Sequence, residues 1–204
     1  MFVPRYFEDL SVLHVGTLPN HAYFVPSSAP RDLQGERRAE SDRFLSLDGD
    51  WGFSYYPSIY DLDDAVSAVR SAGEPAFFDA AFDEGSLDAV LPVPSVWQMH
   101  GYDAHQYSSS CYPFPIDPPY VPQDNPCGVY VRSFEYRADE RAPRAHLAFE
   151  GVDSCFYVWV NGAFIGYSQV SHCTSEFDVT DALHEGENRI AVLVLKWCDG
   201  SYIE

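Results

Sequence analysis

Two apolar runs on either side of Asn161-Gly162 restrict the fold of this chain more than any other feature. Residues 154–168 have the sequence SCFYVWVNGAFIGYS. Both runs are rich in the aromatic and β-branched residues that favour strands. Asn-Gly tolerates positive φ at both central positions of a two-residue turn, and that geometry matches the twist of two antiparallel strands. These residues therefore predict a β-hairpin that turns at Asn161 and Gly162.

Further strands are predicted on both sides of this hairpin. Every second residue from Trp51 to Tyr55 is aromatic, which is the two-residue period of a strand. Alternation also predicts strands in GVYVRSFEYR and RAHLAFEGV, and the nearly continuous apolar run of NRIAVLVLKW predicts a strand with both faces covered. Several short strands separated by turns are typical of an all-β sandwich.

Two helical segments are also predicted. Residues 61–72 begin with acidic side chains, which suit a helix N-terminus, and carry apolar residues on one side. Residues 180–185 predict a short helical turn, with Thr180 as its N-cap and Gly186 as its C-terminal stop.

The remaining segments predict extended chain. Residues 1–40 are rich in proline, serine and charge, so we expect an extended N-terminal arm that lies on another surface, followed by a β-sandwich domain over residues 41–204. Residues 73–126 hold many prolines and predict an extended segment that shapes a loop surface or a binding edge. A solvated charged loop is expected around four arginines that stand among acidic residues, Arg31, Arg37, Arg38 and Arg43.

The charge balance restricts the partners. Twelve Lys and Arg against 31 Asp and Glu give a net charge of −19. This charge disfavours nucleic acid and anionic membranes as partners, whereas a neutral ligand such as a sugar carries no electrostatic penalty. No apolar run approaches the length of a membrane span, and the N-terminus lacks the features of a signal peptide.

The cysteines indicate a reducing compartment. They are odd in number and none forms a C-x-x-C pair, which favours free thiols over a disulfide framework or a zinc knuckle. We therefore expect a cytoplasmic protein whose thiols stay reduced, at Cys111, Cys127, Cys155, Cys173 and Cys198.

No sequence motif supplies a catalytic set. G-x-S-x-G, H-E-x-x-H, G-x-G-x-x-G and Walker sequences do not occur. The seven histidines are scattered, and we expect each to be structural or superficial. Neighbouring acidic residues are frequent in so acidic a chain, and their spacing says nothing about the separation that a glycosidase carboxylate pair needs. Pattern alone therefore leads to an acidic β-sandwich and stops there.

Several segments are similar to one protein family. The main ones are SVWQMHGYDA at 95–104, YPFPIDPPYVPQDNPCGVY at 112–130 and FEGVDSCFYVWVNGAFIGYSQVSHCTSEFDVT at 149–180. They resemble the N-terminal sandwich of the long bacterial β-galactosidases of glycoside hydrolase family 2. The resemblance extends through LPNHAYF, LDGDWGFSYYP and ALHEGENRIAVLVLKWCDGSYIE. It implies a galactose-binding-like jelly-roll β-sandwich with an extended N-terminal arm.

The same resemblance implies that the chemistry takes place outside this chain. The family uses a retaining mechanism with two glutamates in a (β/α)₈ barrel, far downstream of position 204. No catalytic residue is therefore expected within the chain. The family's sodium site is also expected outside it, as is the last strand of the sandwich. We expect a domain fragment that binds carbohydrate and acts as a scaffold, and that is inactive alone.

One substrate-binding residue follows from the resemblance. The family places an asparagine that contacts galactose in a loop reading Y-T-N-V-x-Y-P, and the aligned position here is Ser109. A serine offers one hydroxyl where asparagine offers an amide with two donors and an acceptor. Ser109 is the candidate sugar contact, and an ordinary polar loop is the alternative.

The resemblance also implies a divalent-cation site between the arm and the sandwich. Its ligands align with Asp9, Gln169 and Asp199, with a backbone carbonyl from Val12. Such hard oxygen ligands, completed by water, suit Mg²⁺. A further family carboxylate aligns with Tyr6, which departs from the pattern. Unconnected surface polar residues are the alternative interpretation.

The expected partners are a β-galactoside sugar in the full enzyme, the remaining domains of the same polypeptide, and further copies in a homo-oligomer. Neither nucleic acid nor a membrane is expected. Two other interpretations stay open. A stand-alone carbohydrate-binding module would have a complete sandwich with an exposed aromatic platform. The second interpretation is the equivalent domain of a family 2 β-glucuronidase or β-mannosidase. WQMHGYD and the length of the arm favour β-galactosidase over both.

Overall fold

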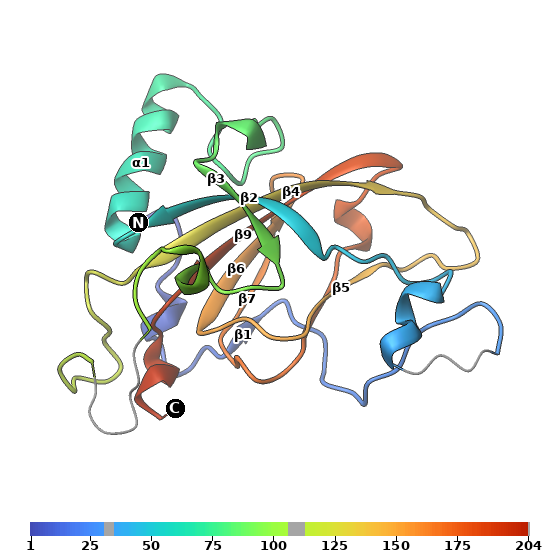
Figure 1. Cartoon of the computed structure of the whole chain (residues 1–204), viewed down its shortest axis with the longest axis horizontal. Coiled ribbons are helices and arrows are strands. Elements are labelled where there is room, and N and C mark those ends of the chain that lie inside the picture. The colour runs from blue at the N-terminus through green and yellow to red at the C-terminus, as the bar shows by residue number, and fades with distance from the viewer. Residues whose placement is uncertain (31–34, 106–112, 204) are drawn as a thin grey trace.

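The structure is a computed structural model that describes residues 1–30, 35–105 and 113–203 (Figure 1). Within these residues, seven antiparallel strands form one sheet in the order β1-β7-β6-β9-β4-β2-β3, and β5 pairs with β8 in a second sheet. The strands are β1 (His14–Val15), β2 (Gly49–Tyr56), β3 (Ala89–Val93), β4 (Cys127–Tyr136), β5 (His146–Phe149), β6 (Cys155–Val160), β7 (Ala163–Ser168), β8 (Ser175–Asp178) and β9 (Gly186–Leu195).

The helical elements are short except for one. The α-helix α1 spans Ile59–Ala72, and no helix in the described part of the chain is long and apolar enough to cross a membrane. The 3₁₀ helices are η1 (Tyr6–Glu8), η2 (Gly35–Glu40), η3 (Glu84–Ser86), η4 (Trp97–His100), η5 (Thr180–Ala182) and η6 (Asp199–Tyr202). The expected all-β sandwich is confirmed.

The predicted hairpin is present as β6 and β7. Its turn residues Asn161 and Gly162 have φ values of 51° and 84°, as the sequence predicted. The Asn161 amide also donates to the Ala182 carbonyl at 2.8 Å and to Asn188 Oδ1 at 2.7 Å. The turn therefore fixes both the hairpin and its contact with the loop before β9.

The apolar run NRIAVLVLKW forms the centre of the large sheet. It lies in β9, which is hydrogen-bonded to β6 on one side and to β4 on the other. Leu193 and Leu195 face one hydrophobic core, and Val192 and Val194 face the other. The prediction that both faces of this strand are covered is confirmed.

The two cores lie on opposite faces of the seven-stranded sheet. One face packs against α1 and the start of the arm, where Val3 and Phe7 are buried. The other face packs against β5 and β8 through Leu147, Phe149 and Phe177. Strands that bury alternate side chains on two faces give the sandwich its layers.

Helix α1 agrees with the prediction except at its start. It begins at Ile59 because the Ser58 side chain accepts a hydrogen bond from the Tyr60 amide at 3.1 Å, which is an N-cap. It ends at Gly73, whose φ of 77° suits a residue without a Cβ atom.

The predicted cap of the later helical turn is wrong. Thr180 is the first residue of η5, and Val179 occupies the cap position. The Thr180 hydroxyl donates to the Asp178 side chain, and its oxygen accepts from the Ala145 amide at 3.0 Å rather than from an amide of the turn. The short strands β1, β3 and β8 were not predicted from the sequence.

The first forty residues contact the sandwich at several points. Strand β1 pairs with β7, Thr17 bridges Phe177, and the Leu18 amide donates to the Glu176 carbonyl at 2.7 Å. The proposed boundary between an arm over residues 1–40 and a domain over residues 41–204 stays a prediction.

Candidate functional site

Asp9, Gln169 and Asp199 come together from three distant parts of the sequence. Asp9 follows η1, Gln169 follows β7, and Asp199 is the first residue of η6. The Gln169 side chain hydrogen-bonds the Asp199 carboxyl, and the charge of Asp9 acts on the same carboxyl. The fold thus places the arm residue beside the two sandwich residues.

The Asp199 carboxyl is buried. Its residue is 6% exposed, and Oδ1 has no hydrogen-bond partner. Burial raises the pKa of Asp199, and the negative charge of Asp9 raises it further. Hydrogen bonds from Gln169 and from backbone amides act in the opposite direction. The result is a buried carboxylate oxygen without a compensating charge, which is a costly arrangement.

Gln169 joins this carboxyl to the sheet. Its Oε1 accepts the Tyr167 hydroxyl at 2.6 Å, so its amide nitrogen is the group that donates to Asp199. A half-turn of the amide would present Oε1 to a cation beside Asp199. Tyr167 tolerates this rotation because a hydroxyl can also accept a hydrogen bond.

The arm contributes an ionised carboxylate. Asp9 Oδ1 accepts from the hydroxyl of Ser11 at 2.6 Å and from its amide at 3.0 Å, and these bonds lower the pKa of Asp9. Tyr6, which occupies the place of a family carboxylate, instead packs its ring on Tyr157 and Tyr167 at 6.2 and 5.4 Å between centroids. The departure at Tyr6 therefore has a packing role.

The donor set fits a hard divalent cation. Two carboxylates and an amide oxygen are the ligand types that Mg²⁺ uses, with water completing the shell. The unpartnered Asp199 Oδ1 is the observation that favours such an ion. No cluster of three or more His, Cys, Asp or Glu side chains suited to a metal occurs in residues 1–30, 35–105 and 113–203. The trio would supply three ligands only with Gln169 as its third member.

Ser109 lies outside the described residues. The segment before it is anchored by a buried ion pair between Lys196, at the end of β9, and Asp103. Lys196 also donates to the Ala104 carbonyl at 3.2 Å, and Asp103 adopts a φ of 60°. The sequence analysis missed this pair because the two residues are 93 positions apart.

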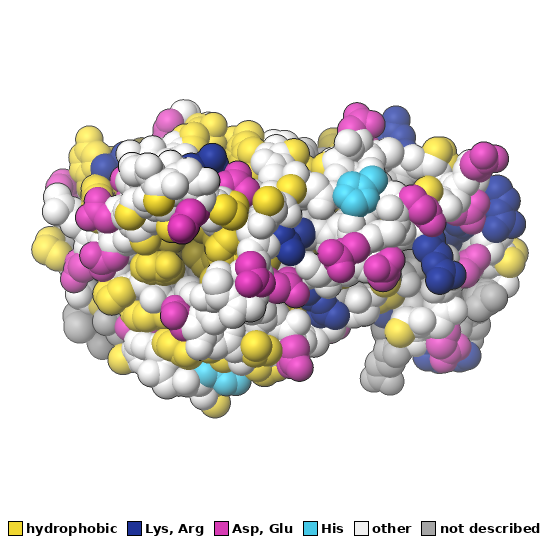
Figure 2. Space-filling model, turned by 90° about the horizontal axis from the view of Figure 1, so that it is seen from above, with side chains coloured by type: hydrophobic (Ala, Val, Ile, Leu, Met, Phe, Trp, Pro, Cys, Tyr) yellow, Lys and Arg dark blue, Asp and Glu magenta, His cyan; other side chains and the backbone are white. Residues whose placement is uncertain are grey.

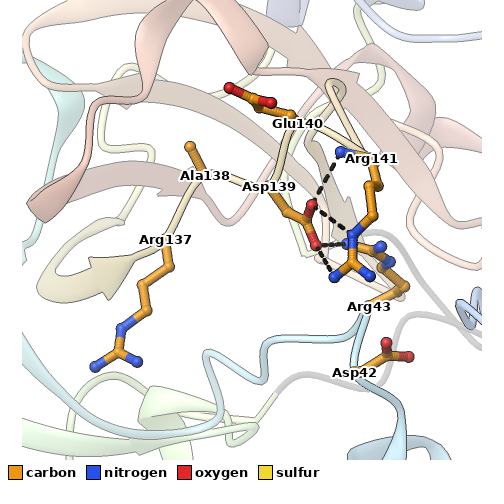
Figure 3. Close-up of a pocket in the computed structure, with 7 residues that line it drawn as sticks. All are labelled: Asp42, Arg43, Arg137, Ala138, Asp139, Glu140 and Arg141. Atoms are coloured by element: carbon orange, nitrogen blue, oxygen red, sulfur yellow. Dashed lines mark hydrogen bonds and ion pairs between the residues drawn. The ribbon is translucent and has the colours of Figure 1, made fainter.

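A charged cavity of about 530 Å³ opens beside the loop after β4 (Figure 3). Asp139 lies between two arginines, accepting from Arg43 at 2.8 Å and from Arg141 at 3.0 Å. Arg141 and then Arg43 hold the pKa of Asp139 well below its usual range. The remaining lining residues are Asp42, Arg137, Ala138 and Glu140. Charged groups that already pair with one another, and no aromatic ring, do not make a platform for a neutral sugar.

Figure 2 shows how charge is spread over one face of the molecule. Acidic side chains are scattered across it, and hydrophobic ones gather toward the end where α1 lies. Two arginines of the predicted charged loop pair with the sandwich, Arg38 with Glu150 and Arg43 with Asp139. A solvated loop was expected here, and for these two arginines that expectation is wrong.

The described cysteines are free thiols, as predicted. Cys127, Cys155 and Cys198 are buried and Cys173 is exposed, whereas Cys111 lies outside the described residues. Burial raises the pKa of Cys127 and of Cys155, so both thiols stay protonated and unreactive at neutral pH.

Comparison with known proteins identifies the family. Residues 44–204 match the model of the glycosyl hydrolases family 2, sugar binding domain. The chain belongs to this family. It is also 47% identical over 204 residues to a β-galactosidase of Actinobacillus pleuropneumoniae and 42% identical over 205 residues to one of Staphylococcus xylosus. These matches cover 100% of this chain but only 18% and 19% of the relatives, so the family 2 chain spans less than a fifth of their length.

Solved structures of β-glucuronidases are also similar. A β-glucuronidase of Bifidobacterium dentium, solved with coumarin-3-O-glucuronide, has 22% sequence identity and a TM-score of 0.48. The match covers 73% of this chain and 19% of that enzyme.

Proposed function

We propose that this family 2 chain is the sugar-binding domain of a β-galactosidase. It would help to hold terminal β-D-galactosides such as lactose for hydrolysis elsewhere in the full-length protein. The identity of 47% to a β-galactosidase, spread over the whole chain, is the observation that carries this proposal. The resemblance of the sequence to that family further supports a retaining mechanism, with both glutamates outside residues 1–204.

We infer that the chain alone does not hydrolyse galactosides. The test is an assay of the purified 23.0 kDa chain with a chromogenic β-galactoside in the presence of Mg²⁺ and Na⁺. The protein is produced in a host that lacks its own β-galactosidase. We expect no turnover. Turnover that co-purifies with the 23.0 kDa species would overturn the proposal.

The role in substrate binding is tested in the full-length protein. We expect it to hydrolyse a β-galactoside in preference to a β-glucuronide or a β-mannoside. Replacing Ser109 with Ala should raise KM for the galactoside with a smaller change in kcat, because it removes a hydroxyl from the sugar contact. An unchanged KM would assign Ser109 to an ordinary polar loop.

Asp9, Gln169 and Asp199 are proposed to hold Mg²⁺ together with the carbonyl of Val12. When bound, the ion would supply positive charge between the carboxylates and tie the arm to the sandwich. The buried, unpartnered Asp199 Oδ1 supports this role. The sodium site of the full enzyme is expected outside this chain.

The proposed partners follow from the same assignment. They are the remaining domains of the polypeptide, the β-galactoside, and further copies in a homo-oligomer. We place the protein in the cytoplasm, which the free thiols support. Size-exclusion chromatography with light scattering on the full-length protein tests the oligomer, and a single-subunit mass would contradict it.

A further inference from the structure

The His21 side chain joins the N-terminal arm to the outer face of the small sheet. Its Nε2 lies 2.6 Å from Glu176 Oε2 on β8, and its Nδ1 lies 2.9 Å from the carbonyl oxygen of Ala22. Phe24 packs on the imidazole at 5.3 Å between ring centroids. All five residues from Asn20 to Phe24 are exposed, so side-chain contacts of this kind hold this part of the arm.

Both ring nitrogens of His21 face acceptors. A backbone carbonyl oxygen can only accept, and an ionised carboxylate can only accept as well. A neutral imidazole carries one N–H and satisfies one of these partners, whereas the imidazolium carries two and satisfies both. The separation of 2.6 Å from Glu176 is short for an N–H···O bond, and charge-assisted bonds are the shorter ones. The geometry therefore belongs to protonated His21.

The neighbouring charges favour the same state. His146 on β5 places Nδ1 3.7 Å from the other Glu176 oxygen, beyond hydrogen-bond distance. Asp178 stands opposite His146 in the strand register, and Arg144 approaches its Oδ2 at 3.6 Å. The pKa of Asp178 is lowered, first by Thr180, so this carboxylate stays ionised beside the cluster. His146 is a second imidazole beside Glu176, so it needs its own control.

We propose that His21 is a pH-sensitive latch: its protonated ring fastens residues 19–25 to β8 through Glu176, and loss of the ring proton releases them. Upstream of this segment the arm stays attached, because the bonds at Thr17 and Leu18 use backbone groups that do not titrate. Within the segment, Tyr23 also bonds to Arg38, and this contact does not depend on His21. Release therefore loosens a short loop that carries the exposed rings of Tyr23 and Phe24.

The direction of the pH dependence follows from linkage. The pKa of His21 is raised above its ordinary value of 6.5, first by the Ala22 carbonyl and then by Glu176. The latch is therefore fully closed below about pH 6.5 and opens as the pH rises through the raised value. Lower pH closes the latch and higher pH opens it.

Hydrogen–deuterium exchange of the 204-residue chain tests the proposal. Exchange of peptides covering residues 19–25 is measured by mass spectrometry at about pH 5.5 and about pH 8.5, relative to the unfolded rate at each pH. We expect several-fold greater protection at the lower pH. His21→Gln should be weakly protected at both values, because a neutral amide does not titrate. His21→Lys should be protected equally at both, because it keeps a positive charge.

Matched variants test whether the pH dependence comes from the proton on His21 or from one on His146. His146→Gln should keep the wild-type pH dependence, and Glu176→Gln should lose it. His21 is exposed on the arm, so the His21 variants are expected to fold, and circular dichroism confirms this before exchange is measured. Equal protection of the wild type at both pH values overturns the latch. So does an unchanged pH dependence in His21→Gln, or its loss in His146→Gln.

Discussion

The buried carboxylate at position 199 is unfavourable, because one of its oxygens has no hydrogen-bond partner. The raised pKa of Asp199 means that the folded chain binds a proton more tightly here than the unfolded chain does. The free energy of unfolding therefore falls as the pH rises from about the ordinary value of 3.8 through the raised value. Above the raised value the cost is fully present unless a cation offsets it.

Replacing Asp199 with Asn should raise the melting temperature in the absence of Mg²⁺ and abolish the stabilisation by Mg²⁺. Without Mg²⁺ the variant should melt at a higher temperature than the wild type, by about 2–4 °C for each kcal/mol gained. With Mg²⁺ the wild type should gain stability by mass action, about 2.7 kcal/mol at a hundred times Kd, and the variant should not respond. Scanning calorimetry with and without Mg²⁺ measures both effects.

The control for this experiment is Asp181→Asn. Asp181 lies on η5 and is exposed. Its neutralisation should change the free energy of unfolding by no more than about 0.5 kcal/mol, with or without Mg²⁺. A wild type that does not respond to Mg²⁺, or an Asp199→Asn variant that responds like the wild type, would show that the three residues bind no cation.

The ion pair between Lys196 and Asp103 supports a second prediction at this scale. Both side chains are largely buried, at 9% and 15% exposure. Lys196→Met should cost about 3–5 kcal/mol, because it leaves the Asp103 carboxylate buried without its partner. Adding Asp103→Asn should recover most of this loss, since asparagine also tolerates the positive φ at position 103. Urea denaturation of the single and double variants gives the coupling energy between the two residues. If the two substitutions change the free energy of unfolding additively, the predicted recovery is wrong.

At the scale of elements, strand β1 depends on a glycine in its partner strand. A Cβ atom on Gly166 would lie 2.1 Å from the Val15 carbonyl oxygen and 2.7 Å from the Phe177 ring. Gly166→Ala should therefore separate β1 from β7 and cost about 1–3 kcal/mol. Chemical denaturation measures the cost. Gly151→Ala is the control, because its Cβ would meet only the Ser171 carbonyl oxygen at 3.3 Å. Equal stability of the two variants would contradict the prediction.

The strands that were predicted from the sequence can each be recognised from a pattern of residues close together in the chain. Asn161-Gly162 and the alternation in β4 lie within single short windows, so the hairpin and the long central strands follow from residue pattern. Strands β1 and β8 have two and four residues and form only because distant partners are already in place. Their own sequences contain no period to detect. Thr180 was wrongly predicted as a cap because its oxygen accepts from the Ala145 amide, 35 positions away, rather than from its own turn.

At the scale of the whole molecule, the candidate cation site combines residues from the two ends of the sequence. Asp9 and Asp199 are separated by almost the full chain, and no spacing rule connects them. The resemblance to family 2 predicted their proximity, whereas residue patterns did not. The contact between His21 and Glu176 was predicted neither by the resemblance nor by residue patterns. The two residues are 155 positions apart, and no motif marks either of them. Such pairs become visible only when the fold brings their elements together.

The net charge of −19 makes overall stability depend on salt. Folding brings 31 acidic groups closer together, with only twelve Lys and Arg side chains to offset them. Raising NaCl from about 10 mM to about 150 mM shortens the screening length from about 30 Å to about 8 Å, so repulsion between distant carboxylates weakens. Close pairs such as Arg43 with Asp139, at 2.8 Å, are screened less. We expect the melting temperature to rise with NaCl, measured by calorimetry.

The slope should be the same in KCl and in Asp199→Asn, since screening by a monovalent salt requires no specific site. At about 150 mM NaCl, Mg²⁺ at low millimolar concentration changes ionic strength little, so a response to it in the wild type alone separates site binding from screening. A melting temperature that falls with NaCl would mean that surface ion pairs, led by Arg38 with Glu150 and Arg43 with Asp139, outweigh the repulsion among the acidic groups. In that case net charge would be a poor guide to the stability of this domain, and the arrangement of its twelve cationic side chains would govern it.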